Sequence, residues 1–140
     1  MTQYPQAQTR ISKLNSPDEL ADELLRHRAR CAYGGWATEY VAHVNSAEAA
    51  LLVIDYYPRT AMSFIQEIFV LQPYRNRGIG TKLLQFAEEQ AKVLDSRVIE
   101  LQVRPLDLMT DEGLLCEWYC SLGYRRVAGS PDRLQKTNAV

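Results

Sequence analysis

Residues 70–81 of the chain, VLQPYRNRGIGT, connect an apolar run to a segment with the periodicity of a helix. In that segment Leu83, Ala87 and Ala91 fall on one face of the predicted helix, and polar residues fall on the other. The first amides of such a helix have no partner within it, and the helix dipole adds partial positive charge there. The junction therefore has the local character of a phosphate-binding site, and a pyrophosphate fits it.

Glycines and arginines in this junction agree with the same interpretation. Gly78 and Gly80 allow a ligand to approach the backbone where a side chain would collide. Arg75 and Arg77 can add positive charge. The glycine spacing alone, however, favours a purely structural explanation, in which the turn only starts a helix tightly packed on a sheet. The chain contains no GxxxxGK[ST] sequence and lacks the third glycine of dinucleotide-binding folds, so neither an ATPase nor a dehydrogenase is supported.

Outward from the junction, the chain alternates between short runs rich in branched and aromatic residues and longer amphipathic segments. The predicted strands span residues 9–14, 38–44, 49–56, 62–70, 98–103, 124–127 and 133–137. The predicted helices span about 17–31, about 111–122 and the segment that follows residue 80. The helix over about 17–31 is predicted from a capping box at Ser16 and Glu19. The helix over about 111–122 ends at Gly123, a residue suited to the left-handed position after a helix.

The composition is that of an ordinary soluble protein that folds as one domain over residues 1–140, with 46% hydrophobic and 24% charged residues. A net charge of -1 disfavours nucleic acid as a main partner. We expect neither a signal peptide nor a membrane span, because the first ten residues are polar and no long apolar run occurs. The three cysteines have no metal-ligand spacing, which predicts a reducing cytoplasmic location.

Two stretches resemble the GNAT superfamily of acyl-CoA-dependent N-acyltransferases. Residues 70–84 resemble its acetyl-CoA motif, and WYCSLGY at residues 118–124 resembles its late helix. The order of predicted strands and helices agrees with that family over nearly the whole chain. The resemblance implies a mixed α/β domain with a twisted, mostly antiparallel sheet flanked by helices on both faces.

The same resemblance implies the activity. The chain is expected to transfer an acetyl group from acetyl-CoA to a primary amine of a small molecule or peptide by direct attack, with no metal. Two alternatives stay open: a non-catalytic module that binds or senses acyl-CoA, and an interaction domain that has lost the cofactor. A homodimer is a further expectation from the family.

By resemblance, backbone amides after Arg75 hold the CoA pyrophosphate, and strand residues act through their main chains. The amide of Ile68 is the candidate oxyanion contact, a kind of donor often worth ~3 kcal/mol of barrier. The predicted cofactor-binding residues are Ile68, Phe69, Val70, Arg75, Asn76, Arg77, Gly78, Ile79, Gly80 and Thr81.

Tyr119 and Glu67 are the predicted catalytic residues. Tyr119 matches the tyrosine that protonates the departing CoA thiolate in many family members; without that match, a ring packed beside Trp118 with its hydroxyl hydrogen-bonded would be the favoured interpretation. Glu67 interrupts an apolar strand, and alternation puts it on the face of Ile65 and Phe69. It could be the general base, a substrate anchor or a structural residue.

Other polar and aromatic residues are weaker candidates. Glu112 stands where many relatives have an asparagine that contacts the cofactor. His43 and His27 are expected to be surface residues, since neither has the partners of a catalytic triad. The pair Tyr56-Tyr57 and Trp36 could line an acceptor pocket, but packing is the safer interpretation of each.

Overall fold

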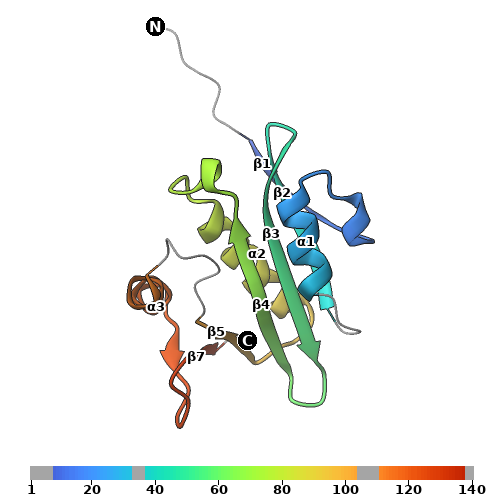
Figure 1. Ribbon diagram of the computed structural model, residues 1–140. Coiled ribbons are helices and arrows are strands. Elements are labelled where there is room, and N and C mark those ends of the chain that lie inside the picture. The colour runs from blue at the N-terminus through green and yellow to red at the C-terminus, as the bar shows by residue number, and fades with distance from the viewer. Residues whose placement is uncertain (1–7, 33–36, 104–110, 138–140) are drawn as a thin grey trace, which may run out of the picture. The chain divides into compact units, whose positions relative to one another are not determined.

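The structure, a computed structural model, describes residues 8–32, 37–103 and 111–137 (Figure 1). Its strands are β1 (Thr9–Lys13), β2 (Ala37–Val44), β3 (Ala47–Tyr57), β4 (Met62–Val70), β5 (Val98–Gln102), β6 (Arg125–Arg126) and β7 (Arg133–Thr137). Its helices are α1 (Glu23–Ala32), α2 (Ile79–Val93) and α3 (Glu112–Ser121), with short 3-10 helices η1 (Pro17–Glu19) and η2 (Gln72–Tyr74).

The strands form one seven-stranded sheet in the order β1-β2-β3-β4-β5-β7-β6. Strand β1 pairs antiparallel with β2, β5 pairs antiparallel with β7, and β4 pairs parallel with β5. The predicted mixed α/β architecture with a mostly antiparallel sheet is therefore confirmed. The predicted strands all occur; β3 is three residues longer than predicted, and β6 is two residues long instead of four.

The described residues group into two compact units. The first comprises residues 1–53 and 67–84, and the second comprises residues 54–66 and 85–140. Strands β3 and β4 and helix α2 contribute to both. Each unit is described by itself below.

In the first unit, α1 lies against β2 and β3 (Figure 1). Leu25 and Ala29 on α1 are fully buried, as are Ala49 to Val53 on β3. Seven consecutive buried residues on β3 mean that both of its faces are covered, which explains why its sequence is a continuous apolar run instead of an alternating one.

The first helix differs from the prediction. Ser16 does accept a hydrogen bond from Asp18 N, but it starts only η1, and Leu20 then leaves the helical region. Glu19 accepts from Asn15 N instead of closing the predicted capping box on Ser16. Helix α1 begins later, because Asp22 Oδ1 accepts from Leu25 N at 2.9 Å. The predicted helix over residues 17–31 is thus two helices.

In the second unit, β5, β7 and β6 form an antiparallel set, and Leu101 pairs with Leu134 at its buried centre. Helix α3 starts at Glu112, directly after its capping residue Asp111 and close to the predicted start, and Gly123 follows its end with φ +100°. An added Cβ at Gly123 would meet Lys136 Cε at 3.3 Å, so both conformation and space favour glycine there.

The parallel ladder between β4 and β5 is short. It covers four residue pairs, from Met62 with Val98 to Ile65 with Leu101. Strand β4 continues beyond it to Val70. Its last five residues, 66–70, lead directly into the junction at residues 70–81.

Candidate functional site

The junction folds as a 3-10 turn followed by a left-handed step into α2. At helix η2, Tyr74 N donates to Leu71 O at 2.9 Å, and Arg75 N donates to Gln72 O at 3.2 Å. Asn76 and Gly78 then adopt φ values of 62° and 78°. Left-handed conformations are accessible to Asn and Gly at little cost, which is the physical reason for these residue types in the loop.

The amides of residues 76–81 face no partner within the described residues. The first helical bond of α2 runs from Lys82 N to Gly78 O at 3.1 Å. The amides before Lys82 make no hydrogen bond to any other described residue, as expected for the first turn of a helix without a capping side chain. This is the property that the sequence predicted for a pyrophosphate site.

Space beside these amides is open. Asn76, Arg77 and Gly78 are exposed, and an added Cβ at Gly78 would have no neighbour within 4 Å. Glycine is therefore needed at position 78 for its backbone conformation, and the space next to it can admit a ligand. Together with the positive end of the α2 dipole, the loop is suited to an anion.

The arginines of the loop are partly engaged within the protein. Arg75 Nε donates to Val70 O at 2.9 Å, and its guanidinium lies 5.6 Å from the centre of the Phe69 ring. The Arg77 guanidinium lies 5.6 Å from the Tyr74 ring. Arg75 therefore fixes the loop to the end of β4, and exposed Arg77 is the more available charge.

Glu67 is buried on β4 and ion-paired. Arg28 on α1 reaches it, with Nη1 at 2.8 Å from Glu67 Oε1. The Arg28 guanidinium also stacks on Phe69 at 4.1 Å from the ring centre. Glu67 and Phe69 thus share a face, as alternation predicted, and Arg28 positions the Glu67 carboxylate. No local pattern predicted this partner, which lies 39 residues earlier in the chain.

Glu39 on β2 was missed by the sequence analysis. It is buried, 5% exposed, and its Oε2 has no hydrogen-bond partner among the described residues. Burial, and secondly the charge of Glu67, raise the pKa of Glu39. A signal was present in the sequence, because Glu39 interrupts a strand whose next residues on the same side are apolar or weakly polar.

Tyr119 is buried in the second unit, 7% exposed. Its ring packs 4.8 Å from Trp118 and edge-on 5.8 Å from Tyr124. Within the described ranges, no group is hydrogen-bonded to its hydroxyl, whereas Tyr124 donates to Glu88 Oε2 at 2.9 Å. Burial raises the pKa of Tyr119 to about 12, so its phenol stays protonated at neutral pH.

The predicted site residues thus fall in both units. Glu67, the β4 residues 68–70 and the loop residues 75–81 lie in the first unit, and Tyr119 lies in the second. The first unit brings Glu67, Phe69, Arg28 and Arg75 into contact. Trp36 lies outside the described residues. His43, which was expected at the surface, is partly buried, and its Nδ1 bonds to nothing in the described part of the chain. His27 is exposed as expected.

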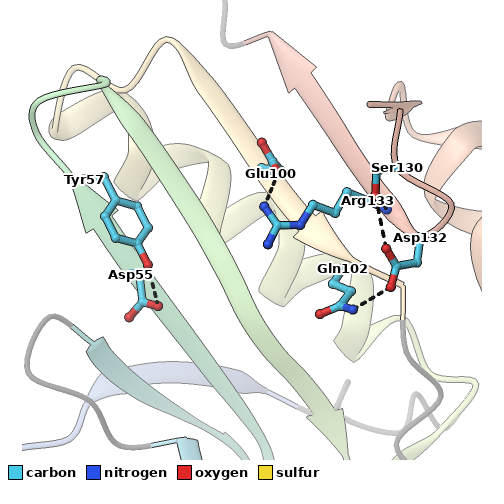
Figure 2. Close-up of polar contacts among 7 residues, drawn as sticks. All are labelled: Asp55, Tyr57, Glu100, Gln102, Ser130, Asp132 and Arg133. Atoms are coloured by element: carbon cyan, nitrogen blue, oxygen red, sulfur yellow. Dashed lines mark hydrogen bonds and ion pairs between the residues drawn. The ribbon is translucent and has the colours of Figure 1, made fainter. Parts of the chain in front are cut away.

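The second unit carries a row of paired polar side chains (Figure 2). Arg133 Nη1 lies 3.0 Å from Glu100 Oε1, and Gln102 donates to Asp132 at 2.5 Å. Tyr57 and Gln66 both donate to Asp55. The hydroxyl of Tyr57 is therefore engaged by Asp55, and the hydroxyl of Tyr56 donates to Leu94 O at 2.8 Å.

A cleft of about 310 Å³ lies next to this row, lined by Val103, Glu112, Gly113, Cys116, Arg126, Pro131, Asp132 and Leu134. Glu112 lines this cleft from the first turn of α3.

Residues 8–32, 37–103 and 111–137 contain no group of three or more His, Cys, Asp or Glu side chains arranged to hold a metal ion. None of the described helices combines the length and apolar character needed to cross a bilayer.

A family model described as Acetyltransferase (GNAT) family matches residues 6–109. Among solved structures, the ribosomal-protein-S18-alanine N-acetyltransferase of Escherichia coli has a TM-score of 0.72 at 15% identity, covering 95% of this chain and 96% of that one. The IAA acetyltransferase of Bacillus cereus ATCC 14579 has a TM-score of 0.71 at 18% identity, covering 93% and 99%.

The PaiA N-acetyltransferase of Thermoplasma acidophilum, solved in complex with coenzyme A, has a TM-score of 0.65 at 15% identity, covering 93% and 99%. At these identities the likenesses show the fold. A search of curated proteins finds no match.

Proposed function

We propose that this chain, which belongs to the acetyltransferase (GNAT) family, transfers an acetyl group from acetyl-CoA to a primary amine of a small molecule or peptide. One observation carries the proposal: at the start of α2, the amides of residues 76–81 bond to no residue that the structure describes, and the space beside Gly78 is open. A diphosphate would accept from several of them at once, and the helix dipole would stabilise its charge.

Acetyl-CoA would supply an acyl group activated as a thioester. The chain contributes the loop amides for the diphosphate and the main chain of residues 68–70 for the acyl-bearing arm. The β4–β5 ladder ends at Ile65, and that stretch of β4 lies beyond it. The Ile68 amide is the proposed donor to the developing oxyanion.

Tyr119 is the proposed proton donor to the departing thiolate. Its hydroxyl has no described acceptor, so it can donate to a ligand. Its pKa of about 12 exceeds that of an ordinary thiol, near 8.5. Stabilisation by a strong hydrogen bond is therefore more favourable than complete proton transfer.

Replacing Tyr119 tests this role. We expect Tyr119→Phe to lower kcat by about 100-fold and to leave the Kd of acetyl-CoA within twofold. Tyr124→Phe is the matched control, because it removes a neighbouring phenol that is already bonded to Glu88. Equal losses in the two variants would assign the effect to packing in place of proton donation.

A pair of glycines tests the cofactor site. Gly78 and Gly129 have φ values of 78° and 81°, and neither has a neighbour within 4 Å of an added Cβ. Substitution by Ala costs about 1 kcal/mol of conformational strain at each. Calorimetry with acetyl-CoA should show about tenfold weaker binding for Gly78→Ala and unchanged binding for Gly129→Ala. Failure of the wild-type chain to bind acetyl-CoA would remove the proposal.

The acceptor is tested with a panel of amines, alcohols and acids, followed by release of free thiol. Turnover restricted to amines supports N-acyl transfer, and turnover restricted to other acceptors contradicts it. Tight acetyl-CoA binding with no turnover of any acceptor would favour the non-catalytic sensing module. The single-domain organisation, the homodimer and the cytoplasmic location remain predictions, and light scattering tests the dimer.

A further inference from the structure

The cleft in the second unit takes no part in the acetyl transfer proposed above. Its walls come from the start of α3, from the β6–β7 hairpin and from the residue that follows β5. None of the residues assigned to acetyl transfer lines it. Its volume of about 310 Å³ is at the lower end of the range for small-molecule sites. A ligand of this cleft is therefore a small molecule.

Two opposite charges line the cleft without neutralising each other. Arg126 Nη1 donates to Pro131 O at 3.2 Å, which holds the guanidinium at the cleft. The remaining N–H groups of that guanidinium have no acceptor among the described residues. Glu112 makes no hydrogen bond or ion pair with any residue that the structure describes. Both groups therefore have their charge available to a ligand.

The third charged group of the cleft, Asp132, is already engaged. Its carboxylate accepts from Gln102 and from Ser130 (Figure 2). Its negative charge nevertheless remains at neutral pH. With two carboxylates and one guanidinium, the cleft is negative overall, which disfavours a ligand that carries only a negative charge.

Apolar groups complete the cleft. Val103 and Leu134 are buried residues that line it, and Leu134 is the β7 partner of Arg126 in the hairpin. Gly113, in the first turn of α3, adds no side chain to the wall. A Cβ at Gly113 would also meet Asp111 Oδ1, the cap of α3, at 3.1 Å. The cleft thus combines one free cation, one free anion and an apolar surface within its described lining.

We infer that this cleft binds a small amino acid zwitterion with an apolar side chain. The Arg126 guanidinium donates to the ligand carboxylate, for which its planar fork of N–H groups is suited. Glu112 accepts from the ligand ammonium group, and Val103 and Leu134 contact the apolar side chain. This is a second ligand site, beyond the proposed acetyl transfer.

The first experiment is calorimetry of the full chain with leucine and with its two half-molecules. Isoamylamine lacks the carboxylate of leucine, and isocaproate lacks its ammonium group. Because a hydrogen bond to a charged group is worth about 1.5–3 kcal/mol, each half-molecule should bind at least about tenfold more weakly than leucine. Isocaproate should bind most weakly, since the cleft is negative. Equal binding of the three compounds, or no binding of leucine, overturns the inference.

Variants assign each charge to one end of the ligand. Arg126→Gln should reduce leucine binding to the level of isoamylamine and leave isoamylamine binding unchanged. Glu112→Gln should reduce leucine binding about tenfold without weakening isocaproate. The matched controls are Arg125→Gln on β6 and Glu117→Gln on α3, which are exposed and do not line the cleft. A control that loses as much affinity as its counterpart would show a general charge effect and overturn the assignment.

Thiol alkylation locates the ligand in the wild-type chain. Cys116 lines the cleft, whereas Cys31 is exposed on α1 in the first unit. At a leucine concentration ten times its Kd, iodoacetamide should modify Cys116 about tenfold more slowly and Cys31 at an unchanged rate, followed by mass spectrometry. Leucine binding without protection of Cys116 would contradict the inference.

Acetyl-CoA is left out of all these measurements, so the two proposals fail separately. A chain that binds acetyl-CoA and not leucine overturns only the amino acid site. A chain that binds leucine and not acetyl-CoA overturns only the acetyltransferase function.

Discussion

Helices α1 and α2 begin in opposite ways. At the start of α1, Asp22 Oδ1 accepts from Leu25 N, and the Glu48 carboxylate accepts from Ala21 N and from Asp22 N, the latter at 2.6 Å. At the start of α2, Gly78 has no side chain, and the amides up to Thr81 bond to no described residue. The chain satisfies one set of helix amides with its own carboxylates and leaves the other for an external anion.

Helix α3 agrees with α1, because Asp111 Oδ1 accepts from Leu114 N at 3.0 Å. Aspartate is a strongly preferred residue at this position, and glycine is a weaker one. The open start of α2 is therefore a property of its own sequence and not of helices in this protein generally.

The largest effect is expected when a carboxylate is placed at the start of α2. Gly78→Asp would place a carboxylate where the diphosphate is expected, and aspartate tolerates left-handed φ better than most residues. Repulsion between like charges should weaken acetyl-CoA binding at least 100-fold, about 2.7 kcal/mol, measured by calorimetry. Gly129→Asp, in the same conformation in the second unit, should bind as the wild type does. Unchanged binding by Gly78→Asp would contradict the assignment of this loop.

The second test removes the carboxylate that accepts from the amides just before α1. Glu48→Ala removes the acceptor for the Ala21 and Asp22 amides. Hydrogen bonds to charged acceptors contribute more than neutral ones, so we expect the free energy of unfolding to fall by about 2 kcal/mol in urea titrations. Acetyl-CoA binding should stay within twofold of wild type. A loss of binding without a loss of stability would mean that α1 and α2 do not have the separate roles described here.

A smaller effect is expected from Asp22→Ala. This variant removes the side-chain acceptor of Leu25 N, and such caps are typically worth about 1 kcal/mol. Glu89→Ala, an exposed position on α2, is the control and should change stability by less than about 0.5 kcal/mol. Equal effects of the two changes, measured by denaturant unfolding, would show that Asp22 is not a cap.

The sequence predicted best where the determining residues are close together. The strand, turn and helix around Gly78 depend on neighbours within a dozen residues, and the structure agrees there closely. The start of α1 was predicted wrongly because Ser16 and Glu19 have the local pattern of a cap, whereas the helix is started by Asp22 with help from Glu48, 26 residues further on.

The surroundings of Glu67 were only partly predicted, for the same reason. Glu67 was visible as a charged residue in an apolar strand, but its partner Arg28 and its neighbour Glu39 come from other elements. Local periodicity carries no information on which distant strands and helices meet. The environment of Glu67 therefore required the fold, and its three predicted roles stay predictions.

Buried phenols at the end of α3 set a condition on how the protein behaves in alkali. Tyr119 and Tyr124 both have pKa values raised above the ordinary value of 10, chiefly by burial. Above pH 10 the two phenols ionise in the unfolded chain while they stay protonated in the folded chain, so the free energy of unfolding falls as pH rises. Tyr119 keeps its proton over that same interval, and strongly basic solutions should consequently unfold the chain before they deprotonate the phenol proposed to assist thiol departure.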